Sequence, residues 1–149
     1  MSAGTKLLLG LVIIAAAYAV SKSFEEPVPP LEGWHHDVNV AAEQSQATGR
    51  PMLALFSASW CGACSSLKRH ALSKLDVQTE LSEVVPVEVD VTDDDDNAGL
   101  AEQMRVYGLP TMIIFAEDGR ELGRLTGSVS KKYVTAWVEQ CLAKGERSG

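Results

Sequence analysis

The chain has 149 residues, 46% of them hydrophobic, and a formal net charge of −7 at neutral pH. This length suits one small globular domain with a short appendage. The negative charge and the lack of a basic stripe argue against a nucleic-acid partner, because phosphate binding needs clustered Lys and Arg side chains. Three cysteines are also too few for a disulfide scaffold in a chain of this length.

An unbroken apolar run at residues 7–20 follows Lys6 and ends in small residues. A charged start, a short apolar stretch and an Ala-x-Ala end describe a secretory signal peptide. The run is shorter than the ~20 residues that a spanning helix normally needs, although its uncharged flanks could lengthen it. We therefore keep two interpretations of residues 1–20, a cleaved signal peptide and an uncleaved N-terminal membrane anchor. Both predict a hydrophobic helix and an exported domain.

Residues 21–33 carry three of the six prolines and show no apolar periodicity. That composition predicts a semi-rigid, extended, Pro-rich linker. We expect the folded domain over residues 34–144, with residues 145–149 as a tail.

Strands and helices alternate along the predicted domain. Asp37 is expected to cap a helix that ends at Thr48, just before Gly49. Strands are expected at Met52–Ala58, Val84–Val91, Thr111–Phe115 and Glu121–Thr126, and further helices from Cys64 to Leu75, over 97–106 and over 134–142. This order predicts an α/β fold with a central mixed β-sheet flanked by helices, with a two-layer α+β arrangement as the alternative.

Cys61 and Cys64 lie three residues apart, between a predicted buried strand and a predicted helix. At a helix start, unpaired backbone N–H groups and the positive end of the helix dipole favour a thiolate. We therefore expect Cys61 to be the catalytic nucleophile and Cys64 the resolving thiol. Gly62 permits tight backbone geometry, and Ala63 continues the helix. The pair predicts redox chemistry that needs no cofactor beyond a Cys61–Cys64 disulfide.

A metal site would be another use for paired cysteines. Zinc needs about four ligands, and His35, His36 and His70 do not supply the second pair that such sites show. The acidic residues 93–96 fail the calcium-loop pattern, because Ala98 stands where that pattern needs glycine. We interpret them as the acidic start of a helix and expect no metal site.

Two motifs carry a family resemblance. Trp60-Cys61-Gly62-Ala63-Cys64 resembles the thioredoxin-family motif WCGPC, with Ala63 in place of the proline. The segment YGLPT at residues 107–111 resembles the second family motif, in which a cis-proline faces the cysteine pair. Together with the acidic run, these motifs are most similar to the C-terminal domain of the disulfide interchange protein DsbD.

The resemblance implies a thioredoxin fold, a cis bond at Pro110, and supporting roles at the site for Trp60, Gly62, Ala63 and Pro110. It also implies that Leu109, through its backbone, and Thr111 bind a substrate strand.

The activity it implies is thiol–disulfide exchange with oxidised client proteins in the bacterial cell envelope. The place would be the periplasm or the outer face of the cytoplasmic membrane, with residues 7–20 in the membrane if they are retained. A membrane electron donor and a monomeric state belong to this expectation. The alternatives are an oxidase that introduces disulfides and a thioredoxin-fold metallochaperone or assembly protein.

Two positions depart from the family pattern. The family has a buried acid six residues before the first cysteine, where this chain has Leu55. DsbD-like domains have a second acid seven residues after that cysteine, where this chain has Lys68. Because Leu55 offers no group to take a proton, we expect Cys64 to resolve mixed disulfides slowly near neutral pH. Cys141 is expected to be a buried helix residue and no third redox centre.

Overall fold

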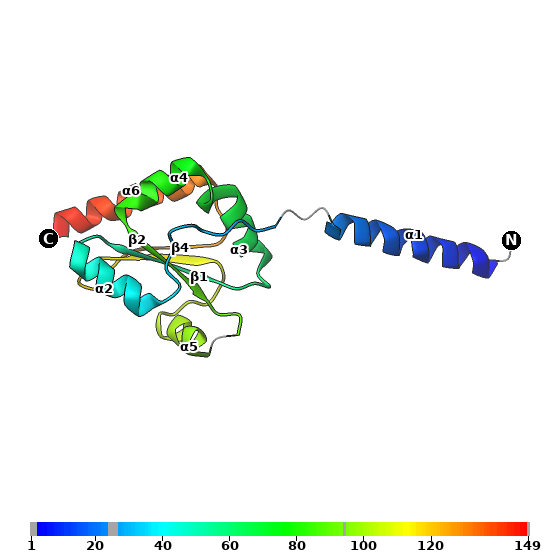
Figure 1. Ribbon diagram of the computed structural model, residues 1–149, viewed down its shortest axis with the longest axis horizontal. Coiled ribbons are helices and arrows are strands. Elements are labelled where there is room, and N and C mark those ends of the chain that lie inside the picture. Colours follow the sequence, from blue (N-terminus) through cyan, green and yellow to red (C-terminus); the bar gives the residue numbers. More distant parts are fainter. Residues whose placement is uncertain (1–2, 24–26, 94, 149) are drawn as a thin grey trace.

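The computed structural model describes residues 3–23, 27–93 and 95–148. Figure 1 shows the arrangement of its helices and strands. The helices are α1 (Ala3–Ser23), α2 (Val38–Thr48), α3 (Gly62–Leu67), α4 (Leu75–Glu80), α5 (Asp95–Gln103) and α6 (Lys131–Ser148), with a π-helical turn η1 (Lys68–Leu72) and a 3₁₀ turn η2 (Leu81–Glu83). The strands are β1 (Met52–Ser57), β2 (Val85–Asp90), β3 (Thr111–Phe115) and β4 (Glu121–Thr126).

The strands form one mixed sheet in the order β2-β1-β3-β4. β1 runs parallel to β2 and antiparallel to β3, and β3 and β4 form an antiparallel hairpin. The hairpin turn contains Gly119 at a φ of 84°, a backbone conformation that favours glycine. These observations confirm the expected α/β fold with a mixed sheet flanked by helices.

Both faces of the sheet are covered, and each has its own apolar core (Figure 1). Leu53, Leu55, Met112 and Ile114 point to the face on which α3, α4 and α6 pack. The alternate residues of the same strands, including Phe56 and Ile113, point to the face covered by α2 and α5. Because strand side chains alternate between faces, a strand buried on both faces is apolar almost throughout, as β1 is.

The helix that follows the cysteines is interrupted, so the prediction of one helix from Cys64 to Leu75 is wrong. α3 ends at Leu67, and in the π-helical turn that follows the Ser73 N–H donates to the Lys68 carbonyl at 3.0 Å. Lys74 then adopts an extended conformation before α4 begins. Leu75, counted as apolar face in the sequence, is 83% exposed, because the wider turn rotates it away from the core.

α1 carries large apolar side chains that are exposed, among them Leu8, Ile14 and Val20. Figure 1 draws it apart from the helices that flank the sheet, and it runs to Ser23, beyond the predicted boundary at residue 20. Among the residues described here, no helix combines the length and the apolar character needed to cross a membrane. The alternatives for residues 1–20 remain predictions.

The packed domain is slightly larger than the segment expected from the sequence. Leu31 and Trp34 are both 7% exposed and belong to the core, so packing begins within the last residues of the predicted linker. At the other end α6 continues to Ser148, through the segment expected to be a tail.

His35 forms a bridge at the outer edge of β2. Its N–H donates to the Pro86 carbonyl at 2.9 Å, and its carbonyl accepts the Glu88 N–H at 2.9 Å. Pro86 therefore lies at an edge position, where its missing N–H leaves no ladder hydrogen bond unmade.

Candidate active site around the Cys61–Cys64 pair

Cys61 lies between the end of β1 and the start of α3. It is the N-cap of α3, and its Sγ accepts the Cys64 N–H at 3.1 Å. Its own N–H donates to the Ala58 carbonyl at 3.2 Å, which closes the turn after the strand. The sulfur therefore sits among the N–H groups at a helix start, the environment expected from the sequence.

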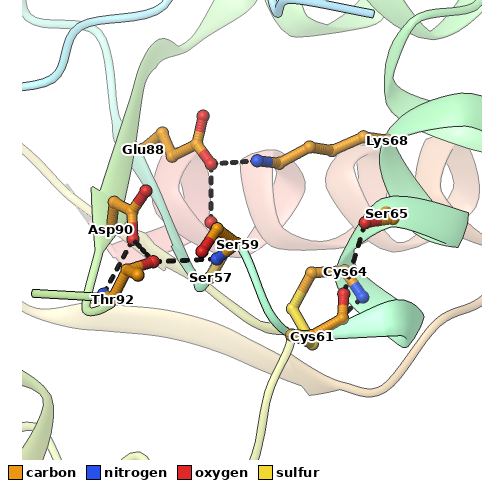
Figure 2. A network of polar contacts seen from close by, with 9 residues as sticks. All are labelled: Ser57, Ser59, Cys61, Cys64, Ser65, Lys68, Glu88, Asp90 and Thr92. Carbon is orange, nitrogen blue, oxygen red and sulfur yellow. Dashed lines mark hydrogen bonds and ion pairs between the residues drawn. A yellow bond between two sulfur atoms is a disulfide. The ribbon is translucent and has the colours of Figure 1, made fainter. Parts of the chain in front are cut away.

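The two cysteines form a disulfide with a Cα–Cα distance of 5.2 Å (Figure 2). Cys61 is 7% exposed and Cys64 is 2% exposed. Both pack in a small apolar cluster with Ala58, against Val91 and Leu109. The pair is thus shielded from water except along one side.

That open side is a cleft of about 510 Å³. Cys61 lines it and Cys64 does not. Trp60, 70% exposed, and Tyr107, 87% exposed, also line it, and Glu102 of α5 contributes a carboxylate. Neither Tyr107 nor Glu102 was predicted from the sequence to lie at the cleft. The position of Tyr107 just before the Gly-Leu-Pro segment was the only signal for either.

The Leu109–Pro110 peptide bond is cis, as the resemblance implied. Leu109 lines the cleft beside Cys61. Thr111 is 1% exposed, and its hydroxyl donates to the Gly108 carbonyl at 2.8 Å and lies 3.0 Å from the Thr126 hydroxyl. Leu109 therefore lies at the cleft, whereas the Thr111 side chain is buried and holds the loop at residues 107–110 through its hydrogen bonds.

A buried acidic side chain that was not predicted lies on the face of the sheet that α3 covers. Leu55 is fully buried in β1, and the residue opposite it in β2 is Glu88, only 9% exposed. The Ser57 hydroxyl donates to Glu88 Oε1 at 2.5 Å, and Lys68 Nζ forms an ion pair with the same oxygen (Figure 2). The Lys68 charge, at the position where DsbD-like domains have an acid, is thus compensated by Glu88.

The signal for Glu88 was present in the alternation of its strand. Val87 and Val89 point to the α2 and α5 face, so Glu88 between them must point to the opposite face, which carries Leu55. A carboxylate at such a position is costly unless it is paired.

Cys141 lies outside the Cys61–Cys64 cluster. It is 1% exposed on α6, in the core on the α4 and α6 side of the sheet. Burial raises the pKa of its thiol, an effect that the nearby Lys144 partly opposes. A group of three or more His, Cys, Asp or Glu side chains suited to a metal ion is absent from the part of the chain that the structure describes.

Comparison with known proteins agrees with this geometry. A family model described as a thioredoxin-like domain matches residues 38–142. The thiol:disulfide interchange protein DsbD of Yersinia enterocolitica is 31% identical over 131 residues, which cover 81% of this chain and 23% of that protein. DsbD of Pasteurella multocida is 34% identical over 92 residues, which cover 60% of this chain and 16% of that protein. The chain thus spans less than a quarter of the length of these relatives.

Solved structures give the same fold. A thioredoxin from Thermus thermophilus superposes with a TM-score of 0.71 at 27% identity, covering 78% of this chain and 93% of that one. The oxidised C-terminal domain of Neisseria meningitidis DsbD superposes with a TM-score of 0.62 at 20% identity, covering 72% of this chain and 97% of that domain. The second likeness shows the fold alone.

The matched residues 38–142 contain the cysteine pair, the cis-proline loop and all four strands. The relatives are named as thiol:disulfide interchange proteins and a thioredoxin, and the Cys61–Cys64 disulfide of this chain lies within the matched residues. The chain therefore belongs to the thioredoxin-like domain family.

Proposed function

We propose that this chain reduces or exchanges disulfides of client proteins in the bacterial cell envelope through the Cys61/Cys64 dithiol. One observation carries the proposal: the disulfide caps a helix N-terminus, and only Cys61 opens onto the cleft. A sulfur that reaches the cleft can meet a client, whereas a buried sulfur one turn away can meet only its neighbour.

The proposed reaction has two steps. The Cys61 thiolate attacks one sulfur of a client disulfide, a mixed disulfide forms, and the client's other sulfur leaves as a thiolate. The Cys64 thiolate then attacks Cys61 Sγ, the Cys61–Cys64 bond forms, and the remaining client sulfur leaves. The client gains two electrons and the chain loses two, so a dithiol donor must reduce the chain again. We assign that role to a membrane electron donor, with no cofactor beyond the cysteine pair.

The cleft suits an extended client segment. Its apolar lining and the exposed Trp60 and Tyr107 can hold an apolar side chain next to the client cysteine. We propose that the backbone of Leu109, before the cis-proline, pairs with that segment. Glu102 at the same cleft favours a client with a basic residue nearby.

The opposite direction, disulfide introduction, uses the same residues. A measured reduction potential separates the two, since reductants of this kind lie at about −270 mV and strong oxidants at about −120 mV. We expect a value close to the first.

Cysteine variants test the chemistry. Cys61→Ser should abolish reduction of insulin disulfides, and Cys64→Ser should accumulate mixed disulfides with clients that gel mobility reveals under non-reducing conditions. Cys141→Ser is the matched control and should reduce insulin at the rate of the unaltered chain. If it were as inactive as Cys61→Ser, the two-cysteine mechanism would have to be abandoned.

Whether the N-terminal segment is retained or removed tests the proposed location in the cell envelope. If residues 7–20 anchor the chain, the domain should sit in the membrane pellet and be open to protease added from outside. If they are a signal peptide, a soluble form starting near Val20 should appear in the periplasm. Cytoplasmic protein that retains residues 1–20 would contradict both arrangements, and sedimentation of the exported form should give a monomer.

A further inference from the structure

One wall of the cleft is the segment at residues 106–109, which runs from the end of α5 to the cis-proline. Its far end is bound to the sheet, because the Thr111 hydroxyl donates to the Gly108 carbonyl and the Gly127 N–H donates to the Pro110 carbonyl at 2.8 Å. Its near end continues from the last turn of α5. The position of this wall therefore depends on how that helix ends.

α5 ends in a turn whose left-handed residue is not a glycine. The Val106 N–H donates to the Ala101 carbonyl at 2.8 Å, and the Arg105 N–H donates to the Glu102 carbonyl at 2.9 Å. These are the two hydrogen bonds of a Schellman motif. Arg105 has a φ of 56°, in the region that such a motif usually gives to glycine. A β-carbon makes this conformation costly, so contacts from outside the helix are needed to favour it.

Arg124 of β4 supplies such contacts. Its Nη2 donates to the Met104 carbonyl at 2.9 Å, and its Nη1 donates to the Arg105 carbonyl at 3.2 Å. Carbonyls at a helix end have no partner within the helix, so the guanidinium satisfies two of them. The Glu121 carboxylate accepts from Nε at 3.1 Å and from Nη2 at 2.9 Å, which holds the guanidinium in this orientation.

We propose that Arg124 is a positioning residue for client recognition. It does not line the cleft, and it acts by holding the end of α5 and thereby the segment at residues 106–109 beside Cys61. β4 then holds both ends of this wall, because the hydroxyl of Thr126, two residues after Arg124, lies 3.0 Å from the Thr111 hydroxyl. This inference rests on the function proposed above.

A purely structural role for Arg124 makes a different prediction. An arginine that only stabilised the domain would, when replaced, lower the melting temperature and leave the KM for clients unchanged while the chain is folded. If Arg124 positions the wall, its loss raises KM, because a client must then order a loosened segment when it binds. The chemical step depends on the cysteines, so kcat stays close to its original value.

The test is reduction of insulin disulfides by Arg124→Met, well below its melting temperature, with KM and kcat measured separately. We expect a KM about 5- to 10-fold higher and a kcat within about 2-fold of the unaltered chain. Exchange with hydroxyethyl disulfide, which is too small to contact both walls of the cleft, should keep its rate. Arg124→Lys keeps the charge but lacks the fork that binds two carbonyls and a carboxylate at once, so its KM should also rise.

Two further variants complete the test. Arg120→Met is the matched control, because Arg120 lies in the hairpin turn beside β4 and pairs with Asp118 at the surface, and its KM should be unaltered. The double variant Arg105→Gly/Arg124→Met separates position from stability. Glycine adopts the left-handed conformation without the penalty of a β-carbon, so this variant should regain stability and keep the raised KM.

An unchanged KM in Arg124→Met or a fully normal KM in Arg124→Lys would overturn the inference. A KM that returns to normal in the double variant together with its stability would overturn it as well. If Arg124→Met fails to fold, the double variant decides by the same criterion. If Cys61→Ser continued to reduce insulin, the proposed function itself would fail. If Cys61→Ser is inactive but the KM of Arg124→Met is normal, only the role of Arg124 fails.

Discussion

Gly123 of β4 lies directly under Cys141 of α6, and adding one methyl group there should destabilise the domain. A β-carbon built on Gly123 would overlap the Cys141 sulfur and lie 3.4 Å from Trp137 Nε1. Cys141 is 1% exposed and Trp137 is 9% exposed, so neither can turn into water to make room. Gly123→Ala must therefore push α6 from the sheet or force a side chain off its rotamer.

The expected loss is about 1–3 kcal/mol, the usual cost of overpacking a filled core. In a domain of this size each kcal/mol lowers the melting temperature by roughly 4 °C. Cys141→Ala alone leaves a small gap and should cost about 1 kcal/mol. In the double variant the new methyl fills the space left by the sulfur, because the nearest remaining atoms, Trp137 Nε1 at 3.4 Å and Cys141 Cβ at 3.9 Å, lie at ordinary contact distances.

The assay is urea unfolding of the oxidised chain, followed by tryptophan fluorescence, for both single variants and the double variant. The two substitutions should couple favourably by about 1–2 kcal/mol, which offsets the cost of Cys141→Ala, so the double variant should be at least as stable as Gly123→Ala. Gly99→Ala in α5 is the matched control, since nothing lies within 4 Å of its added methyl, and it should be neutral or stabilising. A double variant less stable than Gly123→Ala would refute the steric argument.

Three further predictions concern caps and ionisable groups. Asp37→Ala should cost about 1 kcal/mol of unfolding free energy in urea, because the Asp37 carboxylate accepts the N–H of Asn39 at 2.8 Å at the start of α2. Burial raises the pKa of the Cys141 thiol. The buried thiol therefore contributes its full stability below the pKa that it has in the unfolded chain, and this contribution is lost as the pH rises through its pKa in the folded chain. The oxidised chain should therefore lose more stability than Cys141→Ala between about pH 7 and about pH 10, and equal losses would contradict this. A hydrogen bond from Lys131, at 2.7 Å, lowers the pKa of Asp76. The stability that this pair contributes is therefore lost as the pH falls. NMR titration should find the pKa of Asp76 below its usual range, and nearer to that range in high salt.

Local signals were enough to predict most of the fold. The Asp37 cap and the Gly49 stop bound α2 as expected, with Gly49 at a φ of 67°. The apolar strands before and after the motif were placed to within one or two residues. The interruption after Leu67 was missed, because a wider helical turn leaves no pattern in apolar spacing.

The candidate site was only partly predictable, because its parts are distant along the chain. The cysteine pair is contiguous and could be found from its spacing. Glu88 meets Ser57 across 31 residues and Lys68 across 20 residues. Which strand lies beside which is decided by packing of the whole sheet, so no local pattern brings Glu88 next to Leu55.

The bridge at His35 also prevents the sheets of two copies of this domain from pairing along the outer edge of β2. An open sheet edge offers a row of unpaired N–H and C=O groups that recruits strands from other molecules and seeds aggregates. At the outer edge of β2, His35 already binds the Pro86 carbonyl and the Glu88 N–H, and Pro86 has no N–H to offer. A foreign strand would have to displace this bridge before it could add to the sheet, so edge-to-edge stacking is blocked at the centre of the strand.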